Sequence, residues 1–429
     1  MKRLLRRVRN ARVPRPTLRG LGLVAAAIAA LAVAYATGRR ELLFVSMLLL
    51  ALPLLAAAYV LVGRARLGVT RIFDSAIVEA GRPAAVRVTV QNRAALAATP
   101  LVWRDVLPSG ATPAGLLPAL EGGLFAPDRV GGQRMVRYTL TPGRRGVYPI
   151  GPLLIDEQDP LRLCSMRHAV GGSDDLVVTP RITSLPQGKL RHALTDGTSH
   201  RVDHRSSAGE DDLITREYQL GDPLRRVHWR ATARHGELMV RQEEQRSNPE
   251  AMVLLDSDSR HYPGADARSS DAFERAVELA ASVALHLRAA GCGVQVIETA
   301  RPTASYLHAR DSASGDGERA LLVRLAEIDL RDARGERDFA TRASAELHRS
   351  GSSVPLIAVF GALDAGETAS VAALRRWCEP AIAFLAHDSG GTARALTAAG
   401  WLCVDLDRTP DLAAAWAAID ASAVTHDRV

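Results

Sequence analysis

The densest group of chemically active side chains lies between residues 209 and 242. Planar guanidinium groups bind carboxylates through paired hydrogen bonds, so the arginines and acids of this stretch favour an interlocking ion-pair network. A docking face for a partner protein, or an anion site, is the alternative. Catalysis has weak support, because no nucleophile is accompanied by a base and an orienting group. The residues concerned are Arg216, Glu217, Tyr218, Gly221, Asp222, Arg225, Arg226, Trp229 and Arg234.

The alternation of side chains in the same stretch predicts two short strands. Val227 and Trp229 fall on one face of the first strand, where Trp229 would serve as the apolar plug of the network. Leu238 and Val240 fall on one face of the second strand, and residues 235–236 form the turn between the two. We therefore expect a hairpin in the region 188–249.

Two aspartates follow predicted strands further along the chain. Asp256 ends the apolar run 252–255, which is typical of a strand buried on both faces. Asp364 comes shortly after a second apolar run, 355–360. Ligands of parallel sheets bind at the carboxyl ends of the strands, so both aspartates are candidate site residues.

The elements that position these aspartates alternate between strand and helix over residues 250–420. This pattern predicts a doubly wound, mostly parallel α/β domain. The expected strands are 252–255, 294–297, 355–360, 381–385 and 401–404, and the expected helices are 272–290, 317–328, 340–348, 370–378, 392–399 and 411–419. No phosphate-binding GxxxxGK[ST] motif occurs, and we expect no cofactor.

The preceding region, 67–187, follows a period of two. Val86, Val88 and Val90 alternate with polar residues, and turn signals recur along the region. Alternation with one wet face indicates antiparallel sheet, and we predict a β-sandwich-like domain. Two clusters within it, 144–152 and 159–161, are rich in glycine and proline. We interpret them as turns between strands rather than as ligand sites.

Two apolar stretches near the start of the chain are long enough to cross a bilayer. Residues 20–38 carry no charge, residues 42–63 carry none either, and only a short connector separates them. The arm 1–19 holds eight basic residues, and three arginines follow the second stretch by residue 71. The positive-inside bias therefore places both chain ends in the cytoplasm, with 20–63 as a transmembrane hairpin.

The overall charge gives no support to nucleic-acid binding. The formal net charge is +7, but residues 1–19 contribute eight positive charges and 20–71 a net four. The remaining residues, 72–429, therefore carry −5. Aromatic residues make up only 4% of the chain, too few for a base-stacking surface. The widely spaced cysteines suit buried free thiols.

The signature stretch resembles the family called domain of unknown function 58. The resemblance also includes the pairs 145–146, 151–152 and 159–160 and the order of the predicted regions. It implies a membrane-anchored protein with a von Willebrand factor A-like α/β domain and a MoxR-type AAA+ ATPase as partner. The signature residues that carry it are Gly209, Arg216, Glu217, Tyr218, Gly221, Asp222, Arg225 or Arg226, Trp229, Thr232, Ala233 and Arg234.

The same resemblance implies a D-x-S-x-S metal pattern after the first strand of the α/β domain. Here Asp256 matches, Asp258 stands at the second position and Arg260 at the third. A guanidinium repels a divalent cation, so we expect a degenerate site of Asp256, Asp258, Arg260 and Asp364 that binds no metal. An altered site that still binds Mg²⁺ or Mn²⁺ is the alternative. We expect the Asp256 carboxylate to pair with Arg260.

Three functions are compatible with these features. The first, which we favour, is a membrane-anchored, non-enzymatic interaction or scaffold protein that works in the cytoplasm. The second is a metal-dependent hydrolase that uses Asp256 and Asp258. The third is an envelope-facing binding module, which would require the inverted topology.

Overall fold

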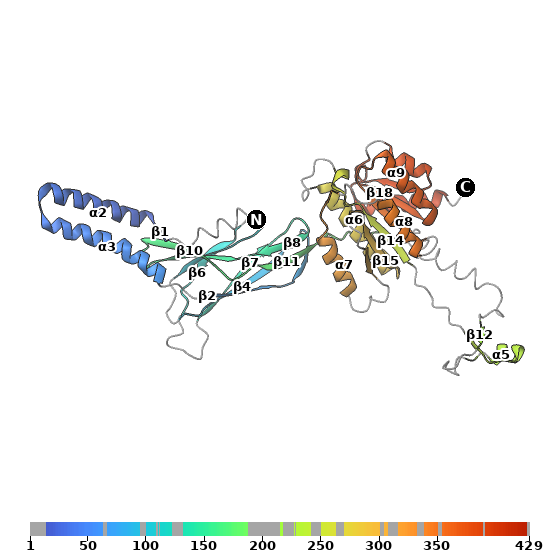
Figure 1. Ribbon diagram of the computed structural model, residues 1–429, viewed down its shortest axis with the longest axis horizontal. Coiled ribbons are helices and arrows are strands. Elements are labelled where there is room, and N and C mark those ends of the chain that lie inside the picture. Colours follow the sequence, from blue (N-terminus) through green and yellow to red (C-terminus); the bar gives the residue numbers. More distant parts are fainter. Residues whose placement is uncertain are drawn as a thin grey trace. The chain divides into compact units, whose positions relative to one another are not determined.

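The computed structural model describes most of the chain, in sixteen stretches (Figure 1). They are 14–62, 67–94, 100–108, 110, 112–121, 132–187, 215–217, 227, 229–241, 250–262, 270–300, 304–307, 316–332, 339–350, 354–388 and 391–426. The chain divides into two compact units, Met1–Thr179 and Pro180–Val429.

The first unit begins with a helical hairpin. Helices α2 (Leu18–Thr37) and α3 (Arg40–Val62) lie against each other, and the Ser46 hydroxyl donates a hydrogen bond to the Ala27 carbonyl at 2.9 Å. Gly38 joins them in the left-handed conformation, with φ of 66°. Both helices are long and apolar enough to cross a membrane, and most of their side chains point away from protein. The two apolar stretches of the sequence thus form the two helices expected.

The rest of this unit consists of three sheets. One has the order β1-β10-β9-β5-β6, the second β2-β4-β7 and the third β3-β11-β8. Their strands are β1 (Arg15–Pro16), β2 (Leu67–Phe73), β3 (Ile77–Glu79), β4 (Ala84–Asn92), β5 (Leu101–Asp105), β6 (Ala114–Leu117), β7 (Gln133–Leu140), β8 (Gly146–Ile150), β9 (Leu153–Gln158), β10 (Cys164–Val170) and β11 (Asp174–Thr179).

The alternation in β4 forms the core of these sheets. Val86, Val88 and Val90 are fully buried, and they share one apolar cluster with Trp103 of β5 and Ile155 of β9. The first two sheets therefore pack against each other through the inward face of each strand. Residues 15–16, which the sequence placed in a basic arm, instead form a strand on β10.

The second unit contains a six-stranded sheet with the order β16-β15-β14-β17-β18-β19. Neighbouring strands are parallel except for β15 and β16. The strands are β14 (Glu250–Leu255), β15 (Gly293–Glu298), β16 (Ala304–Leu307), β17 (Leu356–Phe360), β18 (Ala381–Leu385) and β19 (Leu402–Asp405).

Helices cover both faces of this sheet, because each strand is apolar on both sides. Val253 and Leu255 pack into one core, and Met252 and Leu254 pack into another on the opposite face. The helices are α6 (Asp271–Ala289), α7 (Asp316–Ala326), α8 (Phe339–Ser350), α9 (Ala365–Ala372), α10 (Thr392–Ala398) and α11 (Leu412–His426), with 3₁₀ turns at Ser259–His261 and Ala373–Trp377. The helix expected at 370–378 begins five residues earlier and ends as a 3₁₀ turn.

The signature region folds differently from the expected hairpin. Strands β12 (Thr215–Glu217) and β13 (Met239–Arg241) pair antiparallel, but Trp229–His235 form helix α5 between them. Alanine and arginine favour helix in this segment. Gly236, with φ of 78°, donates its N–H to the Thr232 carbonyl, so it ends a helix rather than joining two strands. The placement of Trp229 on a strand was therefore wrong.

Candidate functional site

The carboxyl ends of β14 and β17 form the point at which the strand order of the sheet reverses. The chain passes from β14 to β15 on one side, and later returns to β17 on the other side. Such a reversal is where open α/β sheets hold their ligands. Asp256 lies directly after β14, and Gly361 lies directly after β17.

Asp256 is completely buried at this point. One of its carboxylate oxygens accepts hydrogen bonds from the Thr299 hydroxyl at 2.9 Å and from the Asp258 N–H at 3.1 Å. The other accepts from the Gly361 N–H at 3.0 Å and lies 2.7 Å from Nδ1 of His261. Every side of the carboxylate is therefore occupied by a hydrogen-bonding group of the protein.

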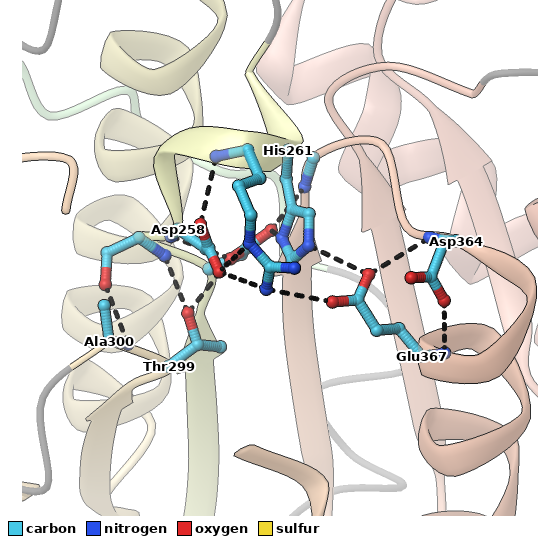
Figure 2. Close-up of polar contacts among 10 residues, drawn as sticks. Asp258, His261, Thr299, Ala300, Asp364 and Glu367 are labelled. Atoms are coloured by element: carbon cyan, nitrogen blue, oxygen red, sulfur yellow. Dashed lines mark hydrogen bonds and ion pairs between the residues drawn. The ribbon is translucent and has the colours of Figure 1, made fainter. Parts of the chain in front are cut away.

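His261 joins Asp256 to a second carboxylate (Figure 2). Its Nε2 lies 2.9 Å from Oε2 of Glu367, on helix α9. Burial by itself would lower the pKa of His261, but the hydrogen bond and charge of Asp256, with the charges of Glu367 and Asp258, raise it to about 9. The imidazole is therefore protonated at neutral pH, and each ring nitrogen donates to one carboxylate.

Arg260 completes the network on its exposed side. Its Nε and Nη2 donate to Oδ2 of Asp258 at 3.0 and 2.6 Å, and Nη2 also lies 3.2 Å from Glu367. Burial raises the pKa of Asp258, but the hydrogen bonds from Arg260 outweigh it and lower the pKa overall. The expected pairing of Asp256 with Arg260 is thus replaced by two pairs, Asp256–His261 and Asp258–Arg260.

Asp364 contributes through the helix that follows it. Its carboxylate accepts from the Glu367 N–H at 2.8 Å, while the Glu367 carboxylate accepts from the Asp364 N–H at 3.1 Å. This capping box holds the first turn of α9 and directs Glu367 towards His261 (Figure 2). Asp364 is therefore a positioning residue. His261 and Glu367 are the two charged members of the site that were not predicted from the sequence.

The residues at the end of β14 do not fit a divalent cation. The oxygens that would bind it already accept hydrogen bonds from amides, a hydroxyl, His261 and Arg260. Two cationic side chains stand beside the carboxylates, and they would repel a metal. Within the described stretches, no group of three or more histidines, cysteines, aspartates and glutamates is arranged to hold a metal ion.

The signature residues are only partly described. Arg216 and Glu217 lie in β12, while Tyr218, Gly221, Asp222, Arg225 and Arg226 lie outside the described residues. Trp229 is 70% exposed at the start of α5, and Arg234 lies exposed in the last turn of that helix. The interpretation of Trp229 as a buried plug was therefore wrong.

A buried ionic cluster in the first unit was not predicted from the sequence. Arg71 donates from Nε and Nη2 to the two oxygens of Asp105 at 3.1 and 2.9 Å, and both side chains are almost fully buried. Tyr138 donates to the same carboxylate, and Asp174 accepts from Nη1 of Arg71 at 2.6 Å. The cluster links β2, β5, β7 and β11, so we assign it to folding.

The two glycine- and proline-rich clusters differ in structure. Residues 146–150 of the first form strand β8, so its interpretation as a turn was wrong for most of the cluster, whereas the second forms the turn between β9 and β10. Gly151 precedes β9 with φ of 108°, and a Cβ there would lie 2.6 Å from the Gly172 carbonyl. Asp159 accepts hydrogen bonds from the N–H groups of Leu161 and Cys164, which folds the turn before β10.

Comparison with known proteins gives a match to one family model, over part of the chain. Residues 214–346 match the family described as protein of unknown function DUF58. The chain carries a DUF58 region. That region includes β12, α5 and β13 and continues through β14, Asp256 and His261 to α8. No curated protein matches the chain.

Several solved structures resemble short parts of the chain. The CARDB domain of a Pyrococcus furiosus protein is 16% identical, over 25% of this chain and 89% of that domain, with a TM-score of 0.18. The C-terminal domain of wzt is 12% identical, over 28% of this chain and 78% of that one, with a TM-score of 0.20. Spo0M, a sporulation control protein from Bacillus subtilis, is 10% identical over 33% and 56%, with a TM-score of 0.14. Scores this low carry no argument about fold or function.

Proposed function

We propose that this DUF58 protein is a membrane-anchored, non-enzymatic interaction protein whose partner docks on the signature region. The anchor is the hairpin of α2 and α3, whose apolar side chains are largely exposed. Both chain ends lie in the cytoplasm, in line with the arginines that precede α2 and follow α3. The partner is a MoxR-type AAA+ ATPase, as the family resemblance implies.

The exposure of Trp229 carries this proposal. Its side chain is 70% exposed, so a large apolar surface is available for contact with another molecule. Tryptophan and arginine are the residue types that contribute most to binding at protein interfaces, and Arg234 lies on the same short helix. Leu238, 40% exposed just beyond the helix, adds apolar area.

The α/β sheet supports a docking role more than a catalytic one. We propose that it is von Willebrand factor A-like, because its strand order has an antiparallel edge strand and Asp256 follows its central strand. The charged groups at that position are paired with one another, since each of the two cations contacts two of the three carboxylates. The network thus serves to hold the strand ends in one rigid arrangement.

A binding titration tests the docking role. The full chain is placed in phospholipid nanodiscs, and a purified MoxR-type ATPase from the same organism is added with ATP. We expect saturable binding that Trp229→Ala weakens by roughly 30-fold, the effect of losing about 2 kcal/mol at an interface hot spot. Leu116→Ala is the matched control, because Leu116 is 69% exposed on β6. Equal affinities for wild type and Trp229→Ala, or no binding by either, would contradict the proposal.

A further inference from the structure

The β-rich part of the first unit is attached directly to the start of helix α2. The Thr17 N–H donates to the Leu163 carbonyl at 2.8 Å, and the Thr17 hydroxyl donates to the Arg162 carbonyl at 2.7 Å. Just before Thr17, strand β1 pairs with β10. The turn 159–163 is therefore tied by backbone hydrogen bonds to the residue that caps α2.

Side-chain packing fixes the same turn against α3. Leu163, Cys164 and Met166 share an apolar cluster with Ala56 and Val60. The thiol of Cys164 donates to the Pro53 carbonyl at 3.6 Å. Gly20 of α2 lies so close to the Leu163 carbonyl that no side chain would fit there. These contacts set the height of the turn along both helices.

That height coincides with the edge of the bilayer. Helix α2 has 20 residues, from Leu18 to Thr37. At about 1.5 Å per residue this is about 30 Å, the thickness of a hydrocarbon core. With α2 spanning the core, Thr17 and the turn bonded to it lie at the level of the lipid headgroups.

The exposed side chains of the turn and of the residues beside it suit the lipid headgroup layer. Leu161 is 56% exposed, and Arg162 beside it is exposed with φ of 57°. Arg15 and Arg19, which flank the α2 cap, are exposed as well. Asp159, in contrast, is buried and binds backbone N–H groups. The turn therefore exposes one apolar and one positively charged side chain, and β1 and the start of α2 add two exposed arginines.

We propose that the turn Asp159–Leu163 is a lipid-binding element of the protein, seated in the headgroup layer beside the hairpin. Leu161 enters the acyl region, while Arg15, Arg19 and Arg162 bind the phosphates of anionic lipids. This inference rests on the membrane anchoring proposed above. It adds that the β sheets are held on the membrane surface instead of hanging from a free linker.

Depth-dependent quenching of tryptophan fluorescence tests whether the turn lies in the headgroup layer. Single tryptophans are introduced into the full chain in nanodiscs of equal parts phosphatidylcholine and phosphatidylglycerol, with brominated acyl chains as quencher. We expect the fluorescence that the new tryptophan of Leu161→Trp contributes to be blue-shifted and to be quenched by the brominated lipid. Val147→Trp is the matched control, because Val147 is 41% exposed but lies on β8 of a different sheet. Its added fluorescence should be unaffected.

One further variant separates the possible failures. Leu48→Trp reports on insertion of α3, because Leu48 is 62% exposed in the middle of that helix. If Leu48→Trp is quenched and Leu161→Trp is not, the turn does not bind lipid, although α3 is inserted in the membrane. If neither is quenched, the anchor itself is wrong.

The lipid charge tests the role of the arginines. In nanodiscs of phosphatidylcholine alone, quenching of Leu161→Trp should fall. Adding Arg19→Gln and Arg162→Asn should remove the difference between the two lipid mixtures; asparagine keeps the left-handed backbone that residue 162 requires. Quenching that is independent of lipid charge would overturn the proposal.

Discussion

The charged residues at the end of β14 differ strongly in their exposure to solvent. His261 and Asp256 are buried, whereas the side chain of Arg260 is 38% exposed. Loss of His261 leaves the buried carboxylate of Asp256 without its cation. Loss of Arg260 leaves Asp258, which is buried as well, but the charge of His261 still acts on Asp258 and the lost partner was itself partly screened by water. The two cations of the network should therefore differ in their effect on stability.

We expect His261→Gln to destabilise the sheet by roughly 3–5 kcal/mol, because Asp256 loses its cation in a dry environment. Arg260→Gln should cost at most about 1 kcal/mol. Hydrogen exchange of the β14 amides in the full chain measures both local opening energies. Equal losses in the two variants would show that the division of roles between these residues is wrong.

The pKa of His261 also predicts how stability depends on pH. The pKa is about 9 in the folded protein and 6.5 for an ordinary histidine. Because folding raises it, the stabilisation is fully present below about pH 6.5 and is lost as the pH rises through about 9. Hydrogen exchange of β14 across this range, corrected for the intrinsic rate, should show weaker protection at the alkaline end. His261→Gln should flatten this dependence; an unchanged slope in the variant would assign it to another group.

The same charges predict the response to divalent cations. We expect no stoichiometric binding of Mg²⁺ or Mn²⁺ by the wild-type chain, measured by calorimetry, because Arg260 and His261 already pair with the carboxylates. Arg260→Ser restores a small hydroxyl and should bind weakly if at all. A micromolar site in wild type that disappears in Asp256→Ala would contradict this account.

At this scale the sequence predicted part of the site. Asp256, Asp258 and Arg260 lie next to one another in the sequence, so a single stretch reveals them. Glu367 and His261 are 106 residues apart in the chain. They meet only because β14 and β17 are neighbours in the sheet. The one local signal of Glu367 was the D-x-x-E spacing of a capping box at Asp364.

Among the elements, strands buried on both faces were predictable and short signature elements were not. The inner strands β14, β17 and β18 contain continuous apolar runs, which are typical of strands buried on both faces. In the signature region, the segment 227–241 has apolar residues at positions that fit strand or helix. The helix propensity of alanine and arginine favours helix α5, with Gly236 at its end.

A substitution at Gly151 tests how much the close packing between elements of the first unit contributes to stability. Its φ of 108° and the proximity of the Gly172 carbonyl and Arg71 should make Gly151→Ala cost roughly 1–3 kcal/mol. Gly172→Ala is the matched control, since its Cβ would meet nothing within 4 Å. Hydrogen exchange of the β9 and β11 amides provides the measurement. Similar protection in the two variants would show that the close approach at Gly151 does not matter.

At the scale of the whole molecule, we propose an anchor in the membrane and a docking region in the cytoplasm. The two helices supply the apolar length, and the arginines near their outer ends supply the orientation. Composition and hydropathy along the chain were enough to predict this hairpin. The turn that binds it was not predictable, because the contact of Thr17 with Leu163 joins segments 146 residues apart.

Fusion of a reporter enzyme that is active only outside the cytoplasm tests this arrangement most directly. One fusion is made after Val429 and a second after Gly38, in the turn between α2 and α3. In bacterial cells the account predicts strong activity for the Gly38 fusion and none for the Val429 fusion. Activity of the Val429 fusion would contradict it, because a docking region outside the cytoplasm would be out of reach of a cytoplasmic ATPase.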